Sequence, residues 1–226
     1  KGDIKNVLKD EELRFYFFTV IAAIILITWN LCGPIFNTIG ESLRQASFQV
    51  STIITTTGFS STNFDLWPSF SKSILVLLMF IGASAGSTAG GIKCIRFLLL
   101  FKTIKHEIRK AIHPRSVYTI KYNGKSVDDN VVSGVKNYFS VYIVIFTCSL
   151  LLISLDGFDL VSNFTSVVAT INNIGPGLGR VGPTGSFADY SALSKIVLSF
   201  TMLFGRLEIY PLMILFAPTF WKRVNI

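Results

Sequence analysis

The stretch that decides the fold is Thr55-Thr56-Thr57-Gly58-Phe59-Ser60-Ser61-Thr62, or TTTGFSST, which carries mostly hydroxyl side chains yet lies between two apolar segments. A second stretch, NNIGPGLG at 172–179, lies between two further apolar segments. Irregular polar backbone at membrane depth survives only where it is buried in protein or lines a water-filled cavity. Two such stretches at matching places in a repeat indicate a transport site rather than two ordinary external turns.

The composition indicates a multi-pass membrane protein. Of the 226 residues, 50% are hydrophobic and only 15% are charged. A helix needs about 20 apolar residues to cross a bilayer. Four segments meet this requirement, at about 15–36, 74–101, 138–155 and 192–221. The second and fourth are longer than a bilayer requires, so tilt or an interruption is expected.

The placement of Lys and Arg predicts the orientation. Basic residues gather before the first span, between the second and third spans, and after the fourth, whereas the other two connections hold more acidic than basic residues. Since basic loops stay cytoplasmic, both ends of this chain are expected there, and the net charge of +8 needs no nucleic-acid partner. The chain opens at Lys1 with neither an initiating Met nor a short signal core, as expected for the middle of a longer protein.

The two halves of the chain repeat each other. The phrase SKSILVLLMFIG at 71–82 returns as SKIVLSFTMLFG at 194–205, and the segment before each is too short and too polar to span. That segment has helical character until it meets Gly58 or Gly175. The pattern predicts an all-α membrane protein with two units, each a span, a re-entrant pore helix and a span.

The first expected unit covers 1–113, with a pore loop at about 40–62. The second covers 114–226, with a cytoplasmic linker and a pore loop at about 158–180. The lysines of the repeated phrase, Lys72 and Lys195, lie near the outer ends of their spans and are expected to anchor at the interface. Residues 102–114 (KTIKHEIRKAIHP) place isoleucines at helical spacing, which predicts an amphipathic helix on the membrane surface or a solvated basic face.

The two polar stretches at 55–62 and 172–179, called the first and second tip, suit a cation. A pore helix that enters from outside and ends at the tip points its carbonyl end, with about half a negative charge, toward the membrane centre. Thr55, Thr56 and Thr57 add hydroxyl and carbonyl oxygens, and Gly58 can turn successive carbonyls toward one axis. Neither tip carries the carboxylates of divalent-cation pores, so a weakly hydrated monovalent cation is expected.

Five strings carry a family resemblance: TTTGFSSTNFDLWP, GASAGSTAGGIK, HPRSVYTIKYNGK, SVVATINNIGPGLG and MLFGRLEIYPLMILFAPTFW. With them, essentially the whole chain resembles the second half of a TrkH-type potassium uptake subunit of the Trk/Ktr superfamily. The resemblance implies four span, pore-helix and span repeats around one pseudo-fourfold, potassium-channel-like pore, of which this chain supplies the third and fourth. It also implies a homodimer, a cytoplasmic TrkA-like nucleotide-binding regulatory subunit and the bacterial inner membrane.

By this resemblance the two tips form a selectivity filter. The expected filter residues are Thr56, Thr57, Gly58, Phe59, Asn173, Ile174, Gly175 and Pro176. K⁺ is expected at the backbone carbonyls of Thr57, Gly58, Ile174 and Gly175. Two loops cannot encircle an ion as four do, so this chain is expected to need further repeats.

The second span breaks its own pattern at 82–91, GASAGSTAGG. Each of its glycines, Gly82, Gly86, Gly90 and Gly91, weakens a helix by about 1 kcal/mol relative to Ala. The run is too rich in glycine for close helix packing alone, so a loop is expected there. The resemblance implies that this loop is an intramembrane gate.

Arg206 lies inside the apolar fourth span, two residues before Glu208. Ionisable residues at such depth usually face a bundle interior or a cavity. The resemblance implies a gating role at the pore constriction, where Arg206 opposes ion passage or holds the loop closed through its carbonyls. The alternative is a structural pair with Glu208 or with an unidentified residue.

The expected function is potassium uptake by carbonyl coordination, with K⁺ as the transported ion and no covalent cofactor. A Ktr-like, Na⁺-coupled or less selective transporter of monovalent cations is one alternative, and a non-transporting membrane scaffold is another. No zinc-protease, nucleophile-elbow or nucleotide-binding motif is present in the sequence, so an enzyme is not expected.

Overall fold

The computed structural model describes residues 9–114, 119–207 and 214. Helices dominate it, and the expected all-α membrane fold is confirmed apart from one small antiparallel hairpin. The helices are α2 (Glu11–Leu31), α3 (Ile39–Ile54), α4 (Ser69–Phe80), α5 (Cys94–Ile112), α6 (Asp129–Ile153), α7 (Leu160–Ile171) and α8 (Ala192–Arg206). The hairpin pairs β1 (Lys121–Tyr122) with β2 (Lys125–Ser126), and Lys121 lies opposite Ser126.

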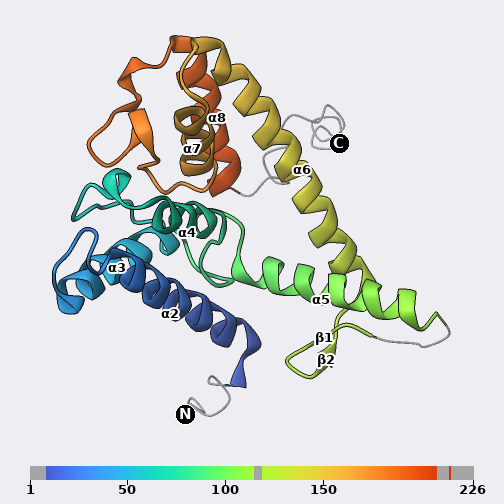
Figure 1. Ribbon diagram of the computed structural model, residues 1–226. Coiled ribbons are helices and arrows are strands. Elements are labelled where there is room, and N and C mark those ends of the chain that lie inside the picture. Colours follow the sequence, from blue (N-terminus) through green and yellow to red (C-terminus); the bar gives the residue numbers. More distant parts are fainter. Residues whose placement is uncertain (1–8, 115–118, 208–213, 215–226) are drawn as a thin grey trace.

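Two helix triplets make up most of the molecule, α2-α3-α4 and α6-α7-α8 (Figure 1). Short 3-10 turns at Phe64–Leu66 and Phe187–Asp189 precede the last helix of each triplet. The ammonium of Lys72 donates to the carbonyl of Asp65 (3.0 Å), and that of Lys195 donates to the carbonyl of Ala188 (2.6 Å). Both lysines therefore tie their helix to the turn seven residues earlier.

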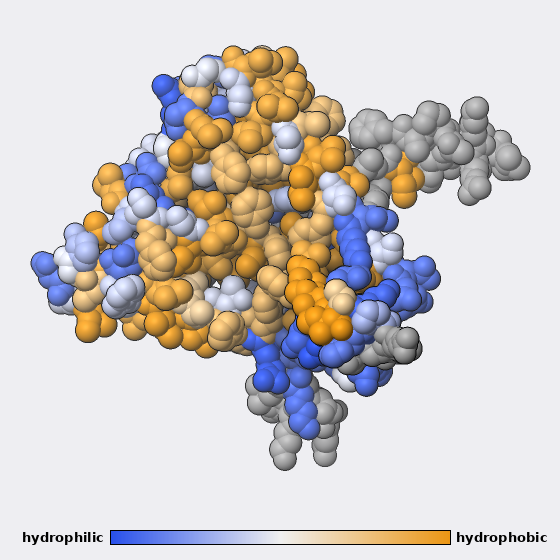
Figure 2. Space-filling model, turned by 45° about the vertical axis from the view of Figure 1, so that its right-hand side comes forward, coloured by the Kyte–Doolittle hydropathy of each residue, from blue (hydrophilic) through white to orange (hydrophobic). Residues whose placement is uncertain are grey.

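Within the described part of the chain, two helices are long and apolar enough to cross a membrane, Glu11–Leu31 and Asp129–Asp156, the latter including the turn after α6. Their outer faces carry large exposed side chains, among them Phe18 (73% exposed) and Trp29 (74% exposed) on α2. Figure 2 shows a broad apolar face, with hydrophilic residues gathered at its lower right and others along its left edge. Such a face suits lipid or further apolar protein rather than water.

The helix boundaries differ from the expected spans. The first span was expected at 15–36, but α2 ends at Leu31 because Gly33, in the left-handed region, and Pro34 follow. The third was expected at 138–155, but α6 begins at Asp129 because the carboxylate of Asp128 accepts from the N–H of Asn130 and caps it.

The second span, expected over 74–101 with a loop at 82–91, is two helices, α4 and α5, with residues 81–93 between them. The surface helix expected at 102–114 is the second half of α5 rather than a separate element. Of the span expected at 192–221, α8 accounts for Ala192–Arg206, and residues 208–213 and 215–221 lie outside the described part of the chain.

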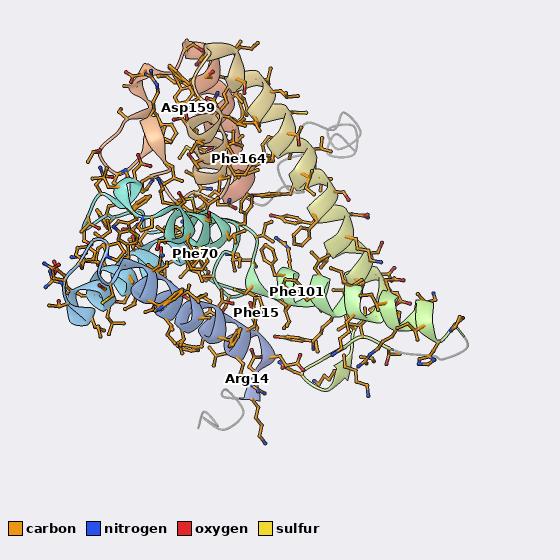
Figure 3. All side chains as sticks on the ribbon, viewed as in Figure 1. Arg14, Phe15, Phe70, Phe101, Asp159 and Phe164 are labelled. Atoms are coloured by element: carbon orange, nitrogen blue, oxygen red, sulfur yellow. The ribbon has the colours of Figure 1, made fainter. Side chains whose placement is uncertain are left out.

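The two triplets share one hydrophobic core. Buried side chains of α2, α3 and α4 pack together with Val168 of α7 and with Ile174 and Leu178 from the second tip. Phe164 of α7 contacts Phe80 of α4 at a ring distance of 6.3 Å (Phe164 is labelled in Figure 3). The shared core places the tips of α3 and α7 next to each other.

Candidate ion-binding site

The two short helices α3 and α7 each start at a side-chain cap. The Thr38 hydroxyl accepts from the N–H of Glu41 at the start of α3, and the Asp159 carboxylate accepts from the N–H of Ser162 at the start of α7. Asp159 lies at the far end of α7 from the tip (Figure 3). These caps satisfy backbone donors that have no partner within the helix.

Asp159 provides a test of the second cap. Hydrogen bonds from Ser162, first from its hydroxyl and then from its N–H, lower the pKa of Asp159 below its ordinary value of 3.8. A lowered folded-state pKa contributes stability that is present above the unfolded-state pKa and is lost as the pH falls through the folded-state value. We expect Asp159→Ala to lower the free energy of unfolding by about 1 kcal/mol, and Asp159→Asn to keep most of the cap. Thermal unfolding at pH 7 measures both, and equal losses would contradict the capping role.

Both α3 and α7 end in the same Schellman motif. Thr56 and Asn173 adopt left-handed backbone angles, with φ of 55° and 54°. In the first tip the N–H groups of Thr56 and Thr57 donate to carbonyls three and five residues back, at 3.0 and 2.9 Å; Asn173 and Ile174 do the same, at 3.0 and 2.8 Å. The helices thus end at Ile54 and Ile171, not at the glycines as expected.

Thr56 is an unusual residue for this position. Asn tolerates left-handed angles, whereas a β-branched side chain adopts them only against steric strain of about 1–3 kcal/mol. The strained conformation brings the Thr56 hydroxyl to the N–H of Gly90, from which it accepts at 3.2 Å. Strain of this kind gathers at functional sites, because the surrounding structure has to enforce it.

The two tips meet at their glycines. Gly58 has a φ of 81°, and a Cβ there would lie 2.1 Å from the carbonyl oxygen of Ile174 and 3.6 Å from Cδ of Pro176. Gly175, at a φ of 116°, has its nearest neighbour at the Cα of Gly58, 3.8 Å from a would-be Cβ. Only glycine at position 58 allows this approach. The outer connections add a further link, because the Asp65 carboxylate accepts from the N–H of Gly179 at 3.1 Å.

A cavity of about 530 Å³ lies beside the tips. Five of the eight expected filter residues line it, namely Thr56, Thr57, Asn173, Ile174 and Gly175, together with residues of α8. Phe59, also expected in the filter, is 70% exposed. Within the described residues no three His, Cys, Asp or Glu side chains converge as metal ligands do, so carbonyl and hydroxyl oxygens are the cation ligands at hand.

Residues 81–93 form a loop closed at its base. The N–H of Gly82 donates to the carbonyl of Ile92 at 2.8 Å, and the N–H of Cys94 donates to that of Ala83 at 3.3 Å. The far part of the loop lies against the end of α7, where a Cβ on Gly90 would lie 2.5 Å from the carbonyl oxygen of Asn172. The loop therefore lies directly at the C-terminal ends of both α3 and α7.

The expected gating glycines are not equivalent. Gly82 and Gly90 approach each other, since a Cβ on Gly82 would lie 2.5 Å from the carbonyl oxygen of Gly90. Gly91 packs against the side chain of Asn172, whereas a Cβ on Gly86 would meet nothing within 4 Å. Three of the four glycines thus serve close packing.

Two cationic side chains bind consecutive carbonyls of the loop. Arg206, the last residue of α8, donates through Nη1 to the carbonyl of Thr88. Lys93 donates to the carbonyls of Ser87 (2.8 Å) and Ala89 (2.5 Å). The alternative partner proposed for Arg206, Glu208, lies outside the described residues.

The family described as "TrkH: Cation transport protein" matches residues 12–223. The chain belongs to the TrkH family. The Trk system potassium uptake protein TrkH of Salmonella typhimurium is 40% identical over 222 residues, which cover 97% of this chain and 45% of that protein. The TrkH of Escherichia coli K12 is 39% identical over the same shares.

A solved structure agrees with the fold. The crystal structure of the potassium transporter TrkH from Vibrio parahaemolyticus superposes with a TM-score of 0.85 at 41% identity, covering 95% of this chain and 46% of that one. The chain thus spans less than half the length of these TrkH relatives. The expected membership of the TrkH family is confirmed.

Sequence reasoning missed three residues around the site of this TrkH family member. Lys93 binds the loop carbonyls, the Asn172 side chain accepts from the hydroxyl of Tyr142 (3.2 Å), and Gly205 packs against the end of α7. The packing role of Gly205 could have been suspected from the sequence, because Gly205 matches Gly82 in the repeated phrase. The other two had none, since a Lys after a glycine run and a second Asn are compatible with many structures.

Proposed function

We propose that this chain forms half of a potassium uptake pore, in which backbone carbonyls of Thr57, Gly58, Ile174 and Gly175 bind K⁺. The observation that carries the proposal is the direct contact of the two tips at Gly58 and Ile174. Two helices that end side by side direct their partial negative charges at one region and favour a cation there. The names of the relatives, potassium uptake proteins, agree with this ion.

The proposed filter comprises residues 56–59 of the first tip and residues 173–176 of the second. Carbonyl and hydroxyl oxygens without fixed charge suit a weakly hydrated monovalent cation. A Ktr-like, Na⁺-coupled or less selective transporter would share this chemistry, and it differs in the competition among K⁺, Rb⁺ and Na⁺. A non-transporting scaffold would show no flux that depends on Gly58.

The proposed gate is the loop 82–91 together with Arg206. The loop lies at the ends of both pore helices, and its carbonyls accept from Arg206 and Lys93. A loop in this position would obstruct an ion that leaves the filter. Its release from the two cations would clear the path.

The proposal also covers the two repeats, their orientation in the membrane and the assembly. Residues 1–113 form one pore repeat, and residues 114–226 form a cytoplasmic linker and the next repeat. The chain lies in the bacterial inner membrane with both ends cytoplasmic, because its basic residues gather on that side. A homodimer and a cytoplasmic TrkA-like nucleotide-binding regulatory subunit complete the proposed assembly.

The test is Rb⁺ uptake into proteoliposomes that hold the full-length protein. We expect Gly58→Asp to reduce uptake to the level of empty vesicles, because its side chain would displace the Ile174 carbonyl. The matched control is Gly157→Asp, since Gly157 also has positive φ (74°) but has open space around it. Wild-type uptake should be inhibited by K⁺ and poorly by Na⁺. Wild-type flux in a folded Gly58→Asp protein would disprove the filter assignment.

A further inference from the structure

Glu12, at the start of α2, is a buried carboxylate with distant partners. Glu12 is 7% exposed. Its Oε1 accepts from the N–H of Ala85 (2.7 Å) and from the N–H of Ile95 (3.2 Å). These partners lie 73 and 83 residues further along the chain. Hydrogen bonds to an ionised acceptor are about twice as strong as neutral ones, so the contact is a substantial tertiary link.

The two partners of Glu12 belong to different parts of the broken span. Ala85 lies in the loop 82–91, and Ile95 is the second residue of α5. The first N–H groups of a helix have no intrahelical partner, and the local residue Lys93 provides no side-chain cap for α5. Glu12, which lies on α2, provides this cap instead, at the positive end of the α5 dipole.

Three hydrogen bonds close the base of the loop. Backbone hydrogen bonds join Gly82 to Ile92 and Ala83 to Cys94, and the thiol of Cys94 donates to the carbonyl of Gly82 at 3.0 Å. Glu12 binds both sides of this closure to α2. Without its carboxylate, the N–H of Ala85 loses a partner and the loop loses its link to α2.

The neighbouring acid has a different partner. Glu11 forms an ion pair with Lys102, in the middle of α5, while its N–H donates to the side chain of Asn123 in the hairpin. Glu11 therefore shares the helix turn and the charge of Glu12 but binds no residue of the loop. It is a matched control for any effect of charge at the start of α2.

We propose that Glu12 is a positioning residue that holds the base of the loop 82–91 in the closed arrangement, by accepting from Ala85 and Ile95 together. The inference rests on the proposed gating role of the loop for its effect on ion flux. The closure itself is a property of the loop and can be measured without flux. Release of Glu12 frees the base of the loop, whereas the side chains of Arg206 and Lys93 bind carbonyls further along it, at 87–89.

Cys94 provides the readout, because its side chain is 0% exposed and lies at the closure. The full-length protein is prepared with Cys94 as its only cysteine, with Cys32→Ser and Cys148→Ser among the replacements. The rate at which a small methanethiosulfonate reagent modifies Cys94 then reports opening of the loop base. Because Glu12→Leu and Glu12→Gln both remove the charge that acts on the thiol, a difference in rate between these two variants excludes a change in thiol ionisation alone. A second preparation that keeps only the exposed Cys148 reports any general change in reactivity.

We expect Glu12→Leu, which keeps the volume but has no acceptor, to raise the Cys94 modification rate at least about tenfold. Glu12→Gln keeps one acceptor oxygen without the charge and should give a rate between those of the wild type and Glu12→Leu. Glu11→Gln should react like the wild type, and the Cys148 rate should not change. A wild-type Cys94 rate in either Glu12 variant overturns the proposal.

Rb⁺ uptake separates this inference from the proposed function. A faster Cys94 reaction with increased uptake supports both the Glu12 closure and the gate. A faster reaction with unchanged uptake supports the closure but contradicts the gating role of the loop.

Discussion

The Gly205→Ala protein is expected to lose Rb⁺ uptake and to unfold at a lower temperature than the wild type. A Cβ on Gly205 would lie 1.8 Å from the carbonyl oxygen of Ile171 and 2.8 Å from Nδ2 of Asn173. Ile171 is the last residue of α7, and Asn173 carries the left-handed turn into the tip. The backbone carbonyl of Ile171 cannot retreat without moving the end of α7, and such overpacking costs about 1–3 kcal/mol or more.

Gly134→Ala is the matched control, since it is also a helical glycine. Gly134 lies in α6, and a Cβ there would meet nothing within 4 Å. Ala in an open helical position should raise the free energy of unfolding by about 0.5–1 kcal/mol. Thermal unfolding in detergent and uptake in proteoliposomes measure both variants. A Gly205→Ala protein as stable and active as the wild type would contradict the close packing of α8 on α7.

The second large effect is expected at Arg206. Arg206→Ala should increase Rb⁺ uptake severalfold, because it removes both the hydrogen bond to the Thr88 carbonyl and a cation near the ion path. A hydrogen bond to a charged group contributes at most about 1.5–3 kcal/mol, and the exposure of Arg206 favours the lower end. Unchanged or reduced uptake in a folded Arg206→Ala protein would contradict the proposed gate.

Arg206→Lys distinguishes two ways in which Arg206 acts. Lys keeps the positive charge but has a compact ammonium in place of the planar guanidinium. If the charge alone opposes ion passage, Arg206→Lys retains wild-type uptake. If the hydrogen bond to Thr88 holds the loop, uptake rises toward that of Arg206→Ala. Arg180→Ala, in an outer turn where Arg180 lies 3.9 Å from Asp189, should leave uptake unchanged.

Much of the helical architecture could be predicted from the sequence. The apolar runs indicate α2 and α6, and the repeated phrase indicates that α4 and α8 are equivalent. The glycine-rich run at 82–91 predicts an interruption, because glycine weakens a helix whatever its surroundings. Boundaries were less predictable: α5 continues to Ile112 across the expected change from a buried span to a surface helix.

The candidate site was predictable only as a set of residues. The strings TTTGF and NNIGPG indicate two tips, but the sequence favoured helix ends at the glycines, whereas Thr56 and Asn173 make the turn. Local preference disfavours a left-handed Thr, so its conformation depends on tertiary contacts such as the one with Gly90. The bonds of Lys93 to the loop carbonyls had no sequence signal.

The sequence by itself determined which segments are apolar, where they repeat and where glycine interrupts them, because these features depend on residue type and short spacings. Only the tertiary structure decided that Gly58 meets Ile174, that Gly205 packs on Ile171 and that Glu12 caps α5. These contacts join residues tens to more than a hundred positions apart, as with Arg206 and Thr88 at a separation of 118. Such contacts arise only when helices far apart in the sequence have packed against one another, so no local pattern encodes them.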